Sequence, residues 1–140
     1  MSYDLEKSIG FKINQTANKI NNKFNTLLQK YDIAPEQRAA LEIIKYEKEV
    51  NQTKIANILA KDKTTISRTL ASLEKKGFIL KKQINKRTNL IELTPQGEKI
   101  LEESVIIVKE FRKKVSSNLD ENEIKKIVEL LEKVAFNMEN

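Results

Sequence analysis

The sequence has 140 residues, of which 39% are hydrophobic and 33% are charged, and its formal net charge is +6. This length is ordinary for one domain and is long enough to bury a core. Because the sequence contains neither cysteine nor histidine, it excludes disulfides, thiolate zinc sites, thiol redox sensing and hydrolase chemistry with a histidine base. We therefore expect neither an enzyme nor a cofactor or metal site.

No apolar run approaches the roughly 20 residues that a membrane-spanning helix needs. The first residues, MSYDLEKSIG, also lack the basic and then apolar pattern of a secretion signal. We expect a cytoplasmic protein that does not bind membranes.

Positive charge is concentrated in the middle of the chain. Residues 45–90 contain 12 Lys and Arg against 4 Asp and Glu, whereas residues 1–44 carry a net charge of +1 and residues 91–140 carry −3. Such asymmetry is typical of a surface that faces nucleic-acid phosphates. An acidic protein partner or an anionic lipid surface would attract the same charge.

Helices dominate the first half of the chain, in which few glycines or prolines interrupt the pattern. Apolar residues three or four apart predict a long amphipathic helix over residues 5–31. Two shorter helices are predicted over residues 35–46 and 52–59, and Asn51 is suited to cap the second of them.

The segment DKTTISRTLASLEKKG, residues 62–77, predicts a fourth helix that ends at Gly77 in a left-handed conformation. One side of this helix is apolar, and the opposite side carries Thr64, Arg68, Ala71 and Lys75. Small residues let a helix approach base edges closely, and an arginine can contact guanine through two hydrogen bonds. A solvated face on a packed helix would have a similar composition.

The runs FILKKQ and NLIELT predict two strands, joined by the basic loop INKRT. Lys86 and Arg87 at the loop are suited to a wing that reaches a flanking minor groove, although charges at a hairpin tip also prevent edge pairing. A long helix should then run from Thr94 to about Ser117. A last helix, with a capping box at Asp120, should carry apolar residues as far as 138.

A short helix, a tight turn near residues 60–63, a second helix and a basic hairpin together predict a winged helix-turn-helix. Gln52 and Thr53, at the start of the first of these helices, could present backbone N–H groups to a phosphate, or could be ordinary first-turn polar residues. The candidate DNA-binding residues are Gln52, Thr53, Lys63, Thr64, Thr65, Ser67, Arg68, Lys75, Asn85, Lys86 and Arg87.

The order of these parts resembles the MarR family of bacterial transcription regulators over essentially the whole chain. The matching residues are LAKDKTTISRTLASLEKKGFI and, in the wing, NKRTNLIELTPQG, with a long helix before them and a helical pair after them. The resemblance implies a mainly α fold with a small β-hairpin wing, as a single domain over residues 1–140. Its winged lobe would span about residues 35–95, and its dimerisation helices about 4–31 and 95–138.

The resemblance also implies a function. Similarity to the family implies a homodimer that binds a pseudopalindromic operator in double-stranded DNA, commonly as a repressor. Asn85 stands where family members usually carry a wing aspartate, whereas Arg87 matches the wing-tip arginine. Because the missing carboxylate removes a partner for a nearby arginine, the resemblance leaves open how rigid the wing is and how it is coupled to the recognition helix.

Many family members release DNA when a small aromatic or anionic compound binds between the dimer helices and the lobe. The resemblance implies that Phe24, Tyr31 and Arg38 could contribute to such a site. The alternative interpretation of the three residues is two core aromatics and a surface arginine.

The outer helices also favour a dimer on their composition alone. Their apolar stripes are longer than a lobe of residues 35–95 could cover, and large exposed apolar patches are uncommon on monomers. A helical bundle within one chain is the alternative. For function, the alternatives are a nonspecific architectural DNA-binding protein and a winged-helix adaptor that binds an acidic protein partner.

Overall fold

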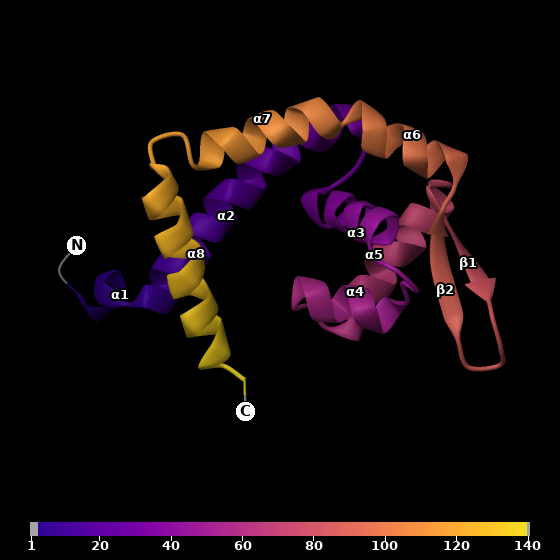
Figure 1. The fold of residues 1–140 in the computed structure, drawn as a ribbon, viewed down its shortest axis with the longest axis horizontal. Helices are drawn as coiled ribbons and strands as arrows, with labels where there is room; N and C mark the ends of the chain where they lie inside the picture. Colours follow the sequence, from indigo (N-terminus) through magenta and orange to yellow (C-terminus); the bar gives the residue numbers. More distant parts are fainter. Residues whose placement is uncertain (1–2, 140) are drawn as a thin grey trace. The chain divides into compact units, whose positions relative to one another are not determined.

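The computed structural model describes residues 3–139 (Figure 1). The helices are α1 (Asp4–Lys7), α2 (Ile9–Leu28), the 3-10 helix η1 (Gln29–Tyr31), α3 (Pro35–Tyr46), α4 (Gln52–Leu59), α5 (Lys63–Lys75), α6 (Pro95–Glu103), α7 (Val105–Val115) and α8 (Glu121–Phe136). The strands β1 (Ile79–Gln83) and β2 (Asn89–Leu93) form an antiparallel hairpin between α5 and α6. The predicted fold class, mainly helical with a hairpin wing, is confirmed.

The described residues divide into two compact units, one ending at residue 106 and the other starting at residue 107. The first contains α3, α4, α5 and the hairpin, which are the parts of the predicted winged lobe, together with α2 and α6, which belong to the predicted dimerisation helices. The second contains most of α7 and all of α8. The organisation of the whole chain as a single MarR-like domain stays a prediction.

A continuous apolar core holds the lobe together. It joins residues from α3, α4, α5, both strands and α6, and its members are Ala40, Leu41, Ile44, Val50, Ile55, Ala56, Ile66, Leu70, Leu73, Ile79, Ile91 and Leu101. Ile66, Leu70 and Leu73 of α5 are each 0% exposed. Because these three residues share one face of α5, the core fixes which face of that helix points outward.

The turn between α4 and α5 is defined by its capping residues. Asn51 caps α4 by accepting a hydrogen bond from the backbone N–H of Lys54, as predicted. Ala60 ends α4 in the left-handed conformation at φ 54°. Asp62 then caps α5, because its carboxylate accepts a hydrogen bond of 2.7 Å from the backbone N–H of Thr65.

The wing is attached to the lobe at its base. β1 and β2 pair from Ile79 opposite Leu93 to Gln83 opposite Asn89. Gly77, between α5 and β1, has φ 82°, which confirms the predicted left-handed end of the helix. The backbone N–H of Ile91 also donates to the carbonyl of Val50 at 2.8 Å, so β2 is bonded to the segment that precedes α4.

Two helices predicted to be continuous are interrupted at serines. Ser8 separates α1 from α2, because its backbone is extended and its side chain caps α2 by accepting from the backbone N–H of Phe11. Ser104 separates α6 from α7. Its hydroxyl lies 2.8 Å from the carbonyl of Ile100, and a serine that bonds back to its own helix competes with the helical pattern and bends the helix.

The second unit ends in a helix with an exposed apolar stripe. The predicted capping box of α8 is confirmed, since Asp120 and Glu123 each accept a hydrogen bond from the other's backbone N–H. Met138 lies beyond the end of α8. Apolar residues of this segment that are 44–74% exposed are Ile127, Val128, Leu130, Leu131, Phe136 and Met138. Within residues 3–139, no helix combines the length and the apolar composition of a membrane span.

Gly97 tests the close packing of α6 against the base of the wing. A Cβ added at Gly97 would overlap the backbone carbonyl of Phe78, which cannot move aside as a side-chain tip can. We expect Gly97→Ala to lower the free energy of unfolding by roughly 1–3 kcal/mol. In the control Gly10→Ala, the added methyl group meets only the Ser8 hydroxyl at 3.7 Å. Urea denaturation at equal protein concentrations measures both, and an equal stability of the two variants would contradict the packing.

The cap of α5 makes a prediction about acid pH. The hydrogen bond from the Thr65 backbone, with a smaller contribution from the charge of Arg68, lowers the pKa of Asp62 from its ordinary value of 3.8. Because the folded-state pKa is the lower one, the cap stabilises the protein above pH 3.8 and its contribution is lost as the pH falls through the folded-state value. An NMR titration of the Asp62 carboxyl should give a midpoint below 3.8. A midpoint at or above that value would contradict the cap.

Candidate nucleic-acid interface

The outward face of α5 carries most of the predicted reading residues. Since the core holds the opposite face, these side chains lie on the outer side of the helix. The exposed ones are Lys63, Thr64, Ser67, Arg68 and Lys75. Thr65 differs from them because it is half-buried and its backbone N–H bonds to the Asp62 cap. A row of small and cationic side chains on an exposed helix is the composition that fits a DNA groove.

The start of α4 contributes differently from what its sequence predicts. Thr53 is exposed. Gln52 is half-buried, and its side-chain amide donates to the carbonyl of Lys63 at 3.0 Å. This hydrogen bond joins the start of α4 to the start of α5. The Gln52 side chain therefore stabilises the helix-turn-helix rather than being free to contact a phosphate.

The wing tip is closed by Asn85. Its side-chain oxygen accepts from the backbone N–H groups of Arg87 at 2.9 Å and Thr88 at 3.0 Å. An amide oxygen performs this function as a carboxylate would, so the turn does not need an aspartate. At its tip, the wing is therefore held by Asn85 itself. Asn85, Lys86 and Arg87 are all exposed.

Most cations of the lobe fall into two groups; Lys48, in the segment between α3 and α4, belongs to neither. Lys45, Lys54, Lys61 and Lys76 each have a carboxylate oxygen within 4.0 Å. Within residues 3–139, the cations of α5's outward face and of the wing have no such partner. These cations are Lys63, Arg68, Lys75, Lys81, Lys82, Lys86 and Arg87. We call these seven residues the unpaired cationic set; their charge is available to a polyanion.

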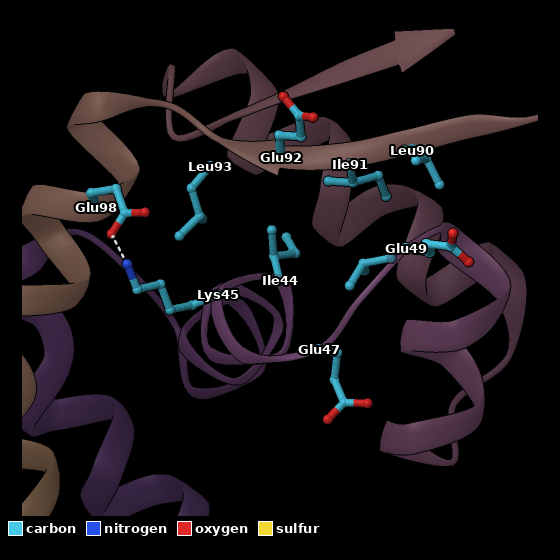
Figure 2. A pocket seen from close by; sticks show the side chains of 10 residues that line it. Ile44, Lys45, Glu47, Glu49, Leu90, Ile91, Glu92, Leu93 and Glu98 are labelled. Atoms are coloured by element: carbon cyan, nitrogen blue, oxygen red, sulfur yellow. Dashed lines mark hydrogen bonds and ion pairs between the residues drawn. The ribbon is translucent and has the colours of Figure 1, made fainter. Parts of the chain in front are cut away.

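The lobe also has a groove lined by several carboxylates. This groove has a volume of about 390 Å³ and lies between the end of α3, the segment after it, β2 and α6. Figure 2 shows the side chains that line it. Its carboxylates are Glu47, Glu49, Glu92 and Glu98. Lys45 donates to Glu98 at 2.8 Å, and this hydrogen bond with the charge of Glu98 raises the pKa of Lys45. Among residues 3–139, no three acidic side chains are arranged to hold a metal ion.

The predicted ligand residues are not brought together as a group. Phe24 is half-buried and lines a groove of about 510 Å³ that also touches Pro35, Leu59 and Lys61. Tyr31 is half-buried too, with the Lys30 ammonium 5.2 Å from its ring centre, and it does not line that groove.

The interpretation of Arg38 as a surface arginine is wrong. It is 3% exposed, and its guanidinium donates to the hydroxyl of Ser104 at 2.8 Å and to the carboxylate of Glu42 at 2.9 Å. These bonds satisfy the charge inside the lobe and tie α3 to the end of α6. The physical reason for the error is that Ser104 lies 66 residues away in the sequence.

Sequence reasoning missed the contacts that hold α5 from the side of α3. Glu36 accepts a hydrogen bond of 2.7 Å from the hydroxyl of Thr69, and Gln37 donates to the hydroxyl of Ser72 at 3.0 Å. Thr69 and Ser72 lie three positions apart, which puts two hydroxyls side by side on one helix. In the sequence, only this spacing indicates a polar contact on that side of α5, and it does not show that residues of α3 are the partners.

Comparisons with known proteins agree with this geometry. The MarR family model matches residues 33–88. An "uncharacterized HTH-type transcriptional regulator" from Bacillus cereus is 32% identical over 127 residues, covering 90% of this chain and 86% of that protein. A MarR/EmrR family transcriptional regulator from Acinetobacter sp. ADP1 has a similar structure, with a TM-score of 0.90, 27% identity and coverage of 97% and 98% of the two chains.

A second similar structure contains nucleic acid. It is a mutant MarR from E. coli complexed with operator DNA, with a TM-score of 0.80, 25% identity and coverage of 90% of this chain and 92% of that one. These similarities extend beyond the lobe to the helices on either side of it. The chain therefore belongs to the MarR family of winged helix-turn-helix transcriptional regulators, which are not enzymes.

Proposed function

We propose that this protein regulates transcription by binding operator DNA, with α5 in the major groove and the wing at a flanking minor groove. The observation that carries the proposal is the unpaired cationic set, whose members belong to α5 and the wing. Lys45, Lys54, Lys61 and Lys76 are instead paired with carboxylates, so most of the unpaired positive charge of the lobe lies on the two elements that contact DNA in this architecture. The relative from E. coli that is complexed with operator DNA supports the same role.

Each part of the surface has a distinct role in this proposal. Arg68 reads guanine from the major groove, because its guanidinium can bond two acceptors on one base. Thr64 and Ser67 are small enough to let α5 approach, and their hydroxyls bond bases or phosphates. The remaining predicted contacts to the backbone and the minor groove come from Gln52, Thr53, Lys63, Thr65, Lys75, Asn85, Lys86 and Arg87.

We also propose that the functional form is a homodimer. The supporting observation is the exposed apolar stripe of α8, because large exposed apolar patches usually mark an interaction surface. Ile9 of α2 is 66% exposed and Ile106 of α7 is 68% exposed, so the other predicted dimerisation helices carry exposed apolar residues as well. A two-fold dimer would present two copies of α5 to a pseudopalindromic operator.

Repression and release by a ligand complete the proposal. Two recognition helices enter successive major grooves only when they are about 34 Å apart. A ligand that binds another spacing more tightly would weaken DNA binding in proportion to its differential affinity. The groove beside Phe24 is the candidate site for a small aromatic or anionic effector, because its lining includes the apolar residues Phe24, Pro35 and Leu59. Its Lys61 is paired with Glu36, which lines the same groove. Buried Arg38 is not part of that effector site.

Two other functions make different predictions about DNA binding. An architectural protein would bind its best genomic site and bulk DNA with nearly equal affinity. An adaptor for an acidic protein would not bind duplex DNA even at about 50 mM salt, where attraction to phosphates is strong. Affinity for both kinds of DNA at two salt concentrations therefore separates the three functions.

The substitution Arg68→Ala tests base reading. We expect it to reduce the discrimination between operator and random DNA by roughly 1–3 kcal/mol, because a contact to a specific base is lost. The comparison is Lys82→Ala on the exposed β1 strand. This change should weaken both complexes about equally and reduce the slope of log affinity against log salt concentration by about one. Fluorescence anisotropy at several salt concentrations measures both effects. An equal loss on the two DNAs for Arg68→Ala would argue against base reading.

The substitution Leu131→Glu tests the dimer. Leu131 is 44% exposed on α8, and a carboxylate there would be costly to bury in an interface. Sedimentation equilibrium should give about twice the chain mass of 16.2 kDa for the unmodified protein and a single-chain mass for the variant. Asn122→Glu adds the same charge about 180° away on the polar side of α8 and should remain dimeric. A single-chain mass for the unmodified protein at the concentration at which it binds DNA would contradict the dimer.

A further inference from the structure

A single carboxylate joins three parts of the helix-turn-helix. Glu36, in the first turn of α3, accepts a hydrogen bond of 2.7 Å from the Thr69 hydroxyl of α5 through one oxygen. Its other oxygen lies 3.7 Å from the ammonium of Lys61, in the turn between α4 and α5. The Glu36 side chain is 28% exposed, so water screens these contacts only in part.

The hydroxyl of Thr69 has two acceptors and only one hydrogen to give. Besides Glu36, the backbone carbonyl of Thr65 lies 3.1 Å from the same hydroxyl oxygen. A bond to a charged carboxylate at 2.7 Å is stronger than a bond to a neutral carbonyl at the longer distance, so Glu36 holds the hydrogen. Without Glu36 the hydroxyl would bond back to its own helix, and threonine back-bonding of this kind bends helices.

The end of α5 that would bend is the end that faces DNA in the proposed function. Thr65 is in the first turn of α5, next to Thr64 and one turn before Arg68. The contacts of Gln37 with Ser72 at 3.0 Å and with Lys76 at 3.1 Å continue along the same side of α5 towards its end. Polar contacts from α3 therefore follow one side of α5. Among them, the contact of Glu36 lies nearest the N-terminal end of α5, which faces DNA in the proposed function.

We propose that Glu36 is a positioning residue for DNA recognition, which sets the direction of the first turn of α5 through Thr69. The proposal rests on the proposed function, since it assigns a role within operator reading. Glu36 does not touch DNA in this account. Because a misdirected helix still presents its cations to phosphates, loss of Glu36 lowers the preference for operator over random DNA and leaves the affinity for random DNA nearly unchanged.

A simpler role for Glu36 is to stabilise α3. An acidic residue in the first turn of a helix interacts favourably with the helix dipole, whatever lies beside it. Glu98 provides the matched control, because it occupies the first turn of α6, pairs with Lys45 at 2.8 Å and makes no contact with α5 among those described. Glu98→Ala thus removes a first-turn carboxylate and an ion pair without removing a contact between α3 and α5.

The test is a double-mutant cycle on the full-length protein, with Glu36→Ala, Thr69→Val and their combination. Dissociation constants for operator and random duplexes give the discrimination ratio. We expect each single variant to lower that ratio about tenfold, and the combination to lower it about tenfold rather than a hundredfold, because both changes remove the same contact. Thr69→Ser keeps the hydroxyl and should keep the ratio, as should Glu98→Ala. An unchanged ratio for Glu36→Ala, or a hundredfold loss for the combination, would overturn the proposal.

A second measurement does not depend on DNA. Hydrogen exchange by NMR in the free protein should show the same altered protection of the amides in the first two turns of α5 in Glu36→Ala and in Thr69→Val. Unaltered protection of those amides in Glu36→Ala would overturn the positioning role, even if the DNA ratios fell. If the unmodified protein has no preference among duplexes while the amides change as expected, the proposed function fails and the positioning of α5 by Glu36 stands.

Discussion

The burial of one face of α5 is the constraint on which the rest of the structure depends. Ile66, Leu70 and Leu73 are 0% exposed in the lobe core, and each such burial contributes roughly 1.5–3 kcal/mol relative to an exposed side chain. A helix held by these residues must turn its other face outward. The direction of Arg68 is thus fixed by the core that also stabilises the fold, and rotation of α5 would cost the buried contacts.

Electrostatics then separates the surface that supports the fold from the surface offered to a partner. Lysines that join elements of the lobe, such as Lys45 and Lys61, are paired with carboxylates from other elements. The unpaired cationic set lies on α5 and the wing, where no carboxylate within residues 3–139 forms an ion pair with it. Carboxylates gather instead in the groove of Figure 2. The net charge of +6 understates this separation, because positive and negative regions partly cancel in the sum.

Local sequence signals were sufficient to predict most helices and strands, and to predict which face of α5 points outward. Asn51, Asp120 and Gly77 mark the ends of elements through bonds or angles within a few residues of themselves, so the sequence predicts them. Ser104 and Arg38 could not be predicted in this way. Their bond joins residues 66 positions apart, and apolar periodicity carries no information about such a polar pair.

The same limit applies to the candidate site. The exposure of Arg68 follows from the helical wheel, but Glu36 meets Thr69 across 33 positions and Gln52 meets Lys63 across 11. These contacts show that the exposed reading face is supported by polar bonds from two other helices. Such support is visible only after the core has brought α3, α4 and α5 together.

The selection of duplexes from a random pool by the purified protein tests the central claim most directly, which is that paired copies of α5 read DNA sequence. Sequencing of the bound fraction should return two inverted half-sites whose centres are about 10 base pairs apart, the spacing of successive major grooves. Enrichment of no sequence, or of isolated half-sites without a fixed spacing, would contradict the claim.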